Sequence, residues 1–233
     1  MKKLGLIGGT GYESTLVYYK AINQLVAKRT NGAVFPEIAI ESVNLSKVLD
    51  LVGSKRYDEL EDYLWQRIEN LIHSGCDEIA LTSITVHIVF DRLKKRMDNS
   101  ARIPFEGMSA VACSEARQNG WRRALLLGTI FTMREDFFKK EFEKQGVEIV
   151  VPDAATMETI QGIIANELEL GIVKPESQQR LLNIISAAKT EWQVDVVILG
   201  CTELPLALNS GITPIPCLDV MDVHINRLVE KIV

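Results

Sequence analysis

Four short, mainly apolar runs constrain the fold of this sequence more than any other feature, because glycine or small polar residues follow each of them. They are Leu4–Ile7, Glu78–Leu81, Ala124–Leu127 and Val196–Leu199. Runs of this length and content are typical of buried strands. The stretches between them show helical patterns, such as the 3.6-residue spacing of apolar residues from Tyr57 to Ser74. Strands that alternate with helices predict parallel sheets joined by right-handed crossovers.

Weaker patterns complete the alternation along the chain. Strands are expected at residues 37–42, 104–107, 147–150 and 213–216, the second of which fits a crossover equally well. Helices are expected at residues 13–29, 57–74, 85–97, 132–145, 157–168, 177–190 and 219–232. Together with the four apolar runs, these elements indicate an α/β protein.

The sequence pattern repeats in its second half. Thr82–Thr85 follows a buried strand in the first half, and Gly200–Glu203 follows one in the second. A chain of 233 residues accommodates two lobes of roughly 100 residues each. We therefore expect two similar Rossmann-like lobes with parallel sheets and an active site in the cleft between them. The first lobe is expected to comprise residues 1–103 and 210–233, and the second residues 104–209.

Charge and composition exclude several classes of function. The net charge is −5 and there is no basic cluster, which argues against binding to nucleic acid. The longest apolar runs are far shorter than a membrane span, and Met1–Lys3 leads into a strand pattern rather than a signal peptide. The four cysteines and three histidines show no metal-ligand spacing. These features predict a reduced cytoplasmic protein that binds no membrane and no structural metal.

Cys201 is the residue whose place in the sequence points most directly to chemistry. It follows Val196–Leu199 and Gly200, and it precedes Thr202 and Glu203, which suit the first turn of a helix. In an open α/β sheet, ligands bind at the carboxyl ends of the strands. A helix N-terminus there is expected to stabilise the reactive thiolate form of the cysteine. The alternative is a buried cysteine that acts as a small hydrophobic residue.

The glycine-rich stretch Gly8–Gly11 matches part of a dinucleotide-binding fingerprint but departs from it at two points. Ser14 stands where the third glycine belongs, and no acidic residue follows at a strand end about 20 positions later. We therefore expect no nucleotide cofactor.

Four stretches match the motifs of a known enzyme family in the same order along the chain. They are Gly8–Thr15, Ser83–His87, Leu127–Thr129 with Thr132–Met133, and Gly200–Glu203. Each is weak alone, but together they span nearly the whole chain, and through them the sequence resembles the aspartate/glutamate racemases. The resemblance implies an amino-acid racemase or epimerase that uses neither pyridoxal phosphate nor any other cofactor. It also implies a homodimer with an amino acid as its substrate.

The resemblance assigns catalytic roles to two positions. In that family two cysteines, one in each lobe, face opposite sides of the substrate α-carbon, where one removes a proton and the other returns one. The second position is Cys201, and the first falls on Ser83. A hydroxyl is a weaker acid and base than a thiol, because its pKa lies several units higher. We therefore expect Cys201 to be the principal acid and base and Ser83 to be its weaker counterpart.

Further residues are expected to contact the substrate. The resemblance implies that the residues lining the substrate are Thr10, Ser83, Ile84, Thr85, Thr202 and Glu203. Thr129 and Thr132 stand at another strand-to-helix turn, where hydroxyls and backbone N–H groups bind carboxylates and stabilise developing negative charge. A threonine before a helix is also a common N-cap, which is the alternative role for these residues.

Three positions depart from the family pattern for acidic substrates. Ile84 replaces an asparagine, Val52 stands where a polar residue is usual, and Met157 stands near the place of a lysine. A side-chain carboxylate on the substrate would lose partners worth about 1.5–3 kcal/mol each. We therefore expect a neutral or larger amino acid, and not simply aspartate or glutamate, as the substrate.

Two other functions fit the same residues. A single-cysteine decarboxylase of malonate-type acids protonates a carbanion on one face only, and Ser83 with Cys201 fits that asymmetry. A degenerate site that binds an amino acid without reaction is the second alternative.

The other reactive side chains are expected to be structural. Cys76, Cys113 and Cys217 fall on apolar or strand positions and are expected in the core. His87 lies within an expected helix, where a histidine whose ring is hydrogen-bonded or partly exposed is more usual than a catalytic base.

Overall fold

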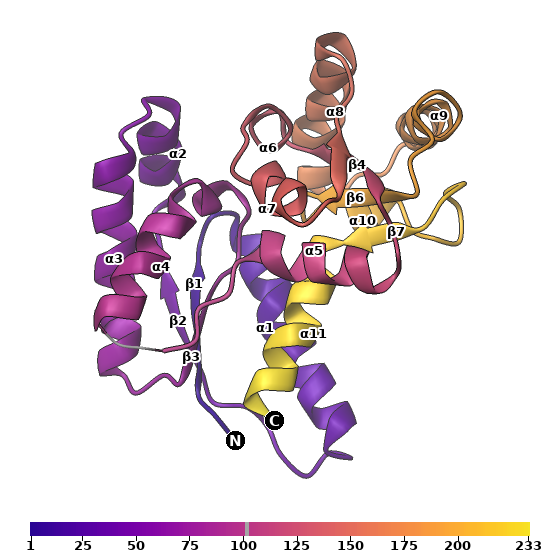
Figure 1. Cartoon of the computed structure of the whole chain (residues 1–233). Coiled ribbons are helices and arrows are strands. Elements are labelled where there is room, and N and C mark those ends of the chain that lie inside the picture. Colours follow the sequence, from indigo (N-terminus) through magenta and orange to yellow (C-terminus); the bar gives the residue numbers. More distant parts are fainter. Residues whose placement is uncertain (101–102) are drawn as a thin grey trace. The chain divides into compact units, whose positions relative to one another are not determined.

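The computed structural model describes residues 1–100 and 103–233, which form two compact units (Figure 1). The first unit comprises Met1–Met108 and His224–Val233, and the second comprises Ser109–Val223. Each unit has its own sheet, and all the strand pairs in both sheets are parallel. The expected α/β class with two parallel sheets is therefore confirmed.

The first unit is built on a three-stranded sheet of order β2-β1-β3. All five residues of β1 are buried, and helices α1 and α11 lie on one side of this sheet and α3 on the other (Figure 1). The elements of this part of the chain are β1 (Leu4–Gly8), α1 (Tyr12–Arg29), β2 (Ile38–Ser42), α2 (Leu45–Gly53), α3 (Tyr57–His73), β3 (Glu78–Leu81), the 3₁₀ helix η1 (Thr85–Val89), α4 (Phe90–Ser100) and α11 (Val220–Ile232).

The second unit is built on a four-stranded sheet of order β5-β4-β6-β7. Its central strands, β4 and β6, pair over five residues from Ala124 to Gly128. The elements of this part of the chain are α5 (Met108–Gln118), β4 (Arg123–Gly128), α6 (Ile130–Arg134), α7 (Lys139–Lys144), β5 (Glu148–Val150), α8 (Ala154–Asn166), the 3₁₀ helix η2 (Leu168–Leu170), α9 (Pro175–Trp192), β6 (Val196–Gly200), α10 (Leu204–Ala207) and β7 (Cys217–Asp219).

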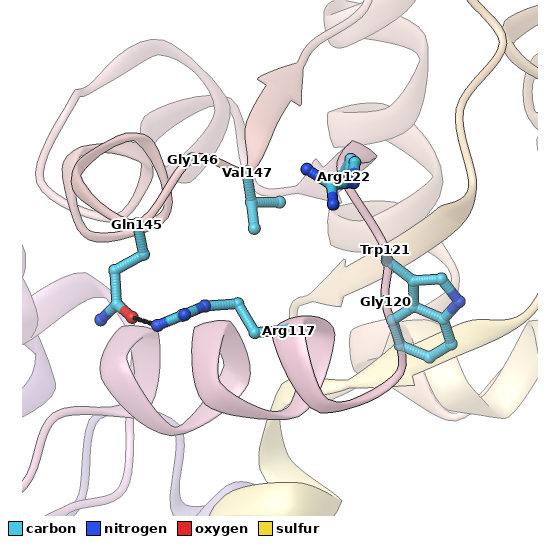
Figure 2. Close-up of a pocket in the computed structure, with 7 residues that line it drawn as sticks. All are labelled: Arg117, Gly120, Trp121, Arg122, Gln145, Gly146 and Val147. Carbon is cyan, nitrogen blue, oxygen red and sulfur yellow. Dashed lines mark hydrogen bonds between the residues drawn. The ribbon is translucent and has the colours of Figure 1, made fainter.

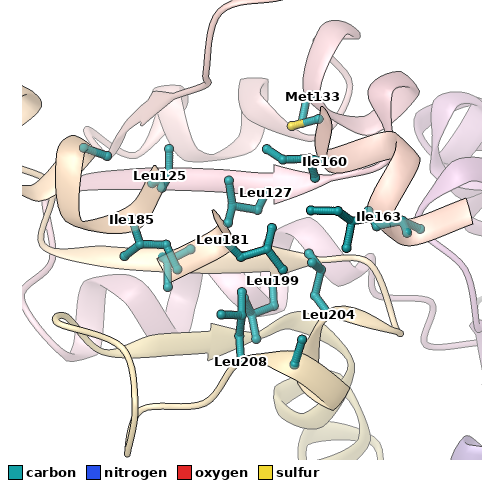
Figure 3. Packing of buried hydrophobic residues seen from close by; sticks show 14 of the residues in the cluster. Leu125, Leu127, Met133, Ile160, Ile163, Leu181, Ile185, Leu199, Leu204 and Leu208 are labelled. Atoms are coloured by element: carbon teal, nitrogen blue, oxygen red, sulfur yellow. The ribbon is translucent and has the colours of Figure 1, made fainter. Parts of the chain in front are cut away.

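One face of the second sheet carries a hydrophobic core that fixes the register of β4 and β6. Alternate residues of a strand point to the same face, so Leu125 and Leu127 on β4 lie beside Val197 and Leu199 on β6. Helices α8 and α9 cover them with apolar side chains, and Figure 3 shows this packing. Each fully buried aliphatic side chain contributes about 1.5–3 kcal/mol. A one-residue slip would turn these side chains away from the core. The packing therefore keeps the carboxyl ends of β4 and β6 in register.

The helix expected over residues 132–145 is wrong, because the chain forms two short helices there. Helix α6 ends where Glu135 is extended, with φ −74° and ψ 153°. The ammonium of Lys139 donates to the carbonyls of Met133 and Arg134 at 3.2 and 3.1 Å and so caps the end of α6. The break allows Phe138, at the start of the next segment, to be buried.

Four other segments differ from the sequence-based expectation. Helices α2 and α5 lie where no element is expected, and residues 104–107 contribute only an isolated bridge between Phe105 and Ile79. The strand expected at residues 213–216 begins at Cys217 instead, because Thr213 forms a turn in which its hydroxyl donates to the carbonyls of Asn209 and Ile215. Strand β7 pairs with β6 and belongs to the second sheet. None of the helices among the described residues combines the length and hydropathy of a membrane-spanning segment.

Candidate active site

The first group of candidate residues lies in the two loops that leave β1 and β3. These strands are parallel neighbours, so both loops leave the sheet at the same edge. Thr82 joins the two strands there, because its backbone N–H and its hydroxyl both lie 3.1 Å from the carbonyl oxygen of Ile7 and donate to it. The structure therefore brings Thr10 to the same edge as Ser83 and Thr85.

The loop after β1 is held close to β2 by a glycine. Gly9 has φ +87°, and a Cβ added to it would lie 2.5 Å from the carbonyl oxygen of Val43. A side chain is excluded at that distance, so glycine is needed for both the conformation and the close approach. The N–H of Gly9 donates to the hydroxyl of Thr15 at 2.9 Å. These contacts fix the backbone that carries Thr10, whose side chain is partly exposed.

Ser83 is held in place through its main chain, which leaves its hydroxyl available to a ligand. Its carbonyl accepts a hydrogen bond from Nδ1 of His87 at 2.8 Å, and Nε2 of the same ring accepts one from the N–H of Met108 at 3.1 Å. The Ser83 hydroxyl forms no hydrogen bond with another described residue. Of its neighbours, Thr85 is partly exposed, whereas the Ile84 side chain is 7% exposed and offers little surface to a substrate.

His87 is therefore a structural residue, as the sequence predicts. A carbonyl only accepts and a backbone N–H only donates, so the two partners require a neutral ring with its proton on Nδ1. The ring is 5% exposed, and burial lowers the pKa of His87 to about 4. The second buried histidine, His224, contacts the hydroxyl of Tyr18 through Nδ1 at 2.7 Å, and burial lowers its pKa to about 3. Neither ring is suited to remove a proton from substrate near neutral pH.

These two histidines make the stability of the fold depend on pH. An unfolded histidine has a pKa of about 6.5. Below pH 6.5 these two histidines are therefore protonated in the unfolded chain but stay neutral in the folded chain. The stabilisation is present above that pH and is lost as the pH falls from 6.5 towards 4 for His87 and towards 3 for His224. We expect the free energy of unfolding of a His87→Gln variant to fall by about 2 kcal/mol less than that of the wild type between pH 7.5 and 5.

Urea unfolding at the two pH values measures this difference. The comparison with the wild type removes the contribution of other groups, such as Asp219, whose pKa burial raises to about 6. NMR of the wild-type imidazoles gives an independent check, because the signal of His87 should not titrate above pH 5. Equal losses of stability in both proteins would show that His87 is charged in the fold.

The second group of candidate residues lies where β4 and β6 end. The last residues of these strands, Gly128 and Gly200, are in register. A Cβ on Gly200 would lie 2.9 Å from the carbonyl oxygen of Leu127, and one on Gly128 would lie 2.9 Å from the carbonyl oxygen of Gly200. Only glycine permits this approach. As a result, Thr129 and Cys201 leave neighbouring strands at one edge of the sheet.

Thr129 and Thr132 are engaged with each other. The Thr129 side chain accepts a hydrogen bond from the N–H of Thr132 at 3.3 Å and is the N-cap of α6, and the two hydroxyl oxygens lie 3.1 Å apart. Thr132 is 1% exposed. Gln161 on α8 accepts from the N–H of Ile130 at 2.8 Å and anchors the same turn. Thr132 and Gln161 therefore hold the turn in place, and Thr129 is the partly exposed residue of the turn that can reach a ligand.

Cys201 donates its thiol proton to a carboxylate two residues away. Its Sγ lies 2.8 Å from Oε2 of Glu203. Burial, followed by the charge of Glu203, raises the pKa of the Cys201 thiol well above its ordinary value, and Glu169 of η2 contributes in the same direction. The expectation that a following helix stabilises a thiolate is therefore wrong. Helix α10 has only four residues, and two carboxylates oppose negative charge on the sulfur.

Some residues that shape this edge were not found from the sequence. Glu169 and Gln161 are distant from Cys201 along the chain and carry no motif, so only the fold brings them to the ends of β4 and β6. Of the remaining cysteines, Cys76 and Cys113 are buried as expected, whereas Cys217 is partly buried, with Thr213 Oγ1 3.2 Å from its Sγ. Among the described residues, no three His, Cys, Asp or Glu side chains are arranged to hold a metal ion.

Comparison with known proteins identifies the family of this chain. The Asp/Glu/hydantoin racemase family model matches residues 7–228, which include every candidate residue above. The chain belongs to this family. The resemblance to the aspartate/glutamate racemases that the sequence motifs indicate is thereby confirmed.

Curated relatives in this family are distant in sequence. A glutamate racemase from Streptococcus gordonii is 25% identical over 156 residues, which are 66% of this chain and 55% of that relative. The chain therefore spans about half the length of the curated relatives it matches. Solved structures match over almost the whole chain. A candidate Asp/Glu racemase from Yersinia pestis has a TM-score of 0.92 at 29% identity, with 99% of each chain covered. An aspartate racemase homologue from Pyrococcus horikoshii has a TM-score of 0.87 at 31% identity, also with 99% of each chain covered.

Proposed function

We propose that this protein is an amino-acid racemase or epimerase in which Cys201 and Ser83 serve opposite faces of the substrate α-carbon. The observation that carries the proposal is the placement of a thiol at the carboxyl end of β6, hydrogen-bonded to Glu203. Membership of the racemase family supports the reaction class. Independence of pyridoxal phosphate, a homodimeric state and a cytoplasmic location remain predictions from the family resemblance.

The protonated state of Cys201 suits it to return a proton to the substrate. A base on the far face takes the α-hydrogen, and the electron pair of the C–H bond moves into the carboxylate of the substrate as an enediolate. Cys201 then gives its thiol proton to the α-carbon, and the sulfur becomes a thiolate. In the reverse direction the thiol must first lose its proton, for which the Glu203 carboxylate at 2.8 Å is the immediate acceptor.

Hydroxyls and backbone N–H groups around both strand edges are suited to bind the substrate carboxylate. The partly exposed threonines are Thr10, Thr85, Thr129 and Thr202. Each follows the carboxyl end of a strand by a few residues, and Thr85 is the first residue of η1. Donors placed there stabilise the negative charge that develops on the carboxylate oxygens as the proton leaves. We propose these residues, with Ser83 and Glu203, as the substrate contacts. Ile84 and Thr132, which are buried, act through packing instead.

The surroundings of the site favour a substrate without a side-chain carboxylate. Val52 and Met157, which stand near the family's polar positions, are each 7% exposed and carry no charge. Lys47, which precedes Val52 by five residues, has its Nζ 4.2 Å from the centre of the Tyr63 ring. A side-chain carboxylate on the substrate would find no charged or hydrogen-bonding partner in the Val52 and Met157 side chains. We therefore propose a neutral or larger amino acid as the substrate.

Decarboxylation of a malonate-type acid is the second candidate. The two candidate groups differ in a way that favours this reaction, because the edge of the second sheet offers a thiol at Cys201, whereas the edge of the first sheet offers only a hydroxyl at Ser83. In that reaction carbon dioxide leaves with the C–C bond cleaved, and the thiol protonates the carbanion on one face. Release of carbon dioxide from a disubstituted malonate, without α-hydrogen exchange in amino acids, distinguishes it from racemisation.

Exchange of the α-hydrogen in D₂O tests the proposed function. We expect the protein to exchange it in at least one amino acid from a panel of D and L forms, with one enantiomer exchanging faster than the other. We expect the faster enantiomer to be the one whose α-hydrogen faces Cys201, because the thiol can pass its proton to Glu203 and still ionises more readily than the Ser83 hydroxyl. Binding of amino acids without any exchange would contradict the proposal and support a non-catalytic binding site. Faster turnover of aspartate than of neutral amino acids would contradict the proposed substrate class.

A further inference from the structure

A cavity of about 240 Å³ opens in the second unit away from the residues described above. It lies between the end of α5, the start of β4 and the turn that follows α7, and Figure 2 shows the residues around it. They are Arg117, Gly120, Trp121, Arg122, Gln145, Gly146 and Val147. The buried side chain of Val147 contributes an apolar part of the wall, while both arginines are exposed.

The two arginines are unusual in this chain because neither is neutralised. Most of its arginines pair with a carboxylate, as Arg123 does with Glu148 at 2.9 Å. Among the described residues, the arginines without an ion pair are Arg117, Arg122 and Arg180. Two of these three therefore line one cavity. Figure 2 shows them on different sides of it, with Arg117 donating to the side-chain oxygen of Gln145 at 2.7 Å.

The backbone around the cavity leaves few other groups for a ligand. Helix α5 ends with a glycine turn in which the N–H groups of Gly120 and Trp121 donate to carbonyls of the helix, each at 3.0 Å. The turn after α7 repeats this pattern, with Gly146 and Val147 donating to α7 at 3.1 and 3.0 Å. Since these N–H groups are engaged, the guanidinium groups are the main free donors. Cations near helix C-termini are favourable in their own right, but Arg122 lies at the start of a strand and has no such role.

We propose that this cavity binds an oxyanion, either a phosphate or a carboxylate, between Arg117 and Arg122. A guanidinium presents a planar fork of donors that matches two oxygens of such a group, and charge-assisted bonds of this kind are stronger than neutral ones. The cavity precedes β4, whereas Thr129 follows it. A strand of six residues separates them by about 20 Å at 3.3 Å per residue. The proposed site is therefore separate from the catalytic edge, and it does not depend on the proposed function.

Calorimetric titration of the intact chain with inorganic phosphate at low ionic strength tests the proposal. The Arg117→Ala/Arg122→Ala double variant should bind phosphate at least about 10-fold more weakly than the wild type, because two charge-assisted contacts are lost. Arg180→Ala is the matched control, since it removes another exposed, unpaired arginine on α9 and should change the affinity by less than about 2-fold. Both variants alter exposed side chains and should unfold at the same urea concentration as the wild type.

A Cys201→Ala variant distinguishes this site from the catalytic edge and should bind phosphate as the wild type does. Glutarate, used as a second probe in the same titration, shows whether the cavity prefers a phosphate or a carboxylate. The proposal is overturned if the wild type binds neither probe, if the double variant binds as tightly as the wild type, or if Cys201→Ala abolishes binding.

Discussion

A Cys201→Ala variant is expected to lose α-hydrogen exchange by a factor of about 10² to 10⁴, which is the usual contribution of a positioned acid or base. The loss follows from the geometry at the end of β6, where the Cys201 thiol carries a proton that it donates to the Glu203 carboxylate at 2.8 Å. Alanine keeps the backbone and removes the only proton that this side chain can transfer. The exchange rates of both enantiomers, measured in D₂O, check the expectation.

Cys217→Ala is the matched control for this variant. Cys217 is also a partly buried thiol in the second sheet, and β7, which carries it, pairs directly with β6. Its thiol contacts Thr213 rather than a carboxylate. We expect the control to retain exchange within about 2-fold, since surface-proximal changes away from a site are usually small. Full exchange in Cys201→Ala, or equal losses in the two variants, would show that Cys201 is not the acid.

The raised pKa of Cys201 determines which proton-transfer role the thiol is ready for before substrate binds. A protonated thiol is ready to give a proton but must be ionised before it can accept one, and each pKa unit above the working pH costs about 1.4 kcal/mol. Burial and the Glu203 and Glu169 carboxylates all act against ionisation. Binding of a substrate ammonium group near Glu203 would offset the negative charge of that carboxylate. Substrate binding would therefore lower the pKa of the Cys201 thiol and make the thiolate easier to form.

Local sequence patterns were sufficient to predict most strands of both sheets but not all the helices. Buried strands such as Val196–Gly200 are continuous apolar runs bounded by glycine, a signal that needs no tertiary information. Helix α2 is short, and its N-cap, Asn44, gives a sequence signal that many turns share. The break between α6 and α7 depends on Lys139, which reaches back to the carbonyls of α6. Such contacts depend on three-dimensional packing and produce no periodic pattern in the sequence.

The candidate site divides in the same way. The rule that ligands bind at the carboxyl ends of parallel strands points to Cys201, and the resemblance to the racemase family adds Ser83. The protonation state of the thiol was not predictable, because the main cause of its raised pKa is burial, which only the fold determines. His87 illustrates the reverse case, since its neutral form follows from one carbonyl and one N–H that the sequence does not place near it. Strand ends are therefore readable from sequence, while the electrostatics around them are not.

A Ser83→Cys variant is expected to accelerate exchange of the slower enantiomer by about 10²-fold, because a thiol replaces a hydroxyl whose pKa lies several units higher. The Ser83 side chain is partly exposed and makes no hydrogen bond to another described residue, so a sulfur fits without breaking a contact. The hydrogen bond from His87 to the Ser83 carbonyl keeps the loop in place in the variant. The faster enantiomer, which depends on Cys201, should change little.

Two further variants separate chemistry at Ser83 from the addition of a thiol. Ser54→Cys introduces a thiol at an exposed position after α2 and should leave both exchange rates unchanged. Ser83→Ala should slow the slower enantiomer further if the hydroxyl takes part, and should leave it unchanged if a water molecule is the base. An unaltered rate in Ser83→Cys would place this side chain away from the reacting carbon and would leave Cys201 acting on one face alone. That result is the one expected of a decarboxylase, which needs a proton from one side only.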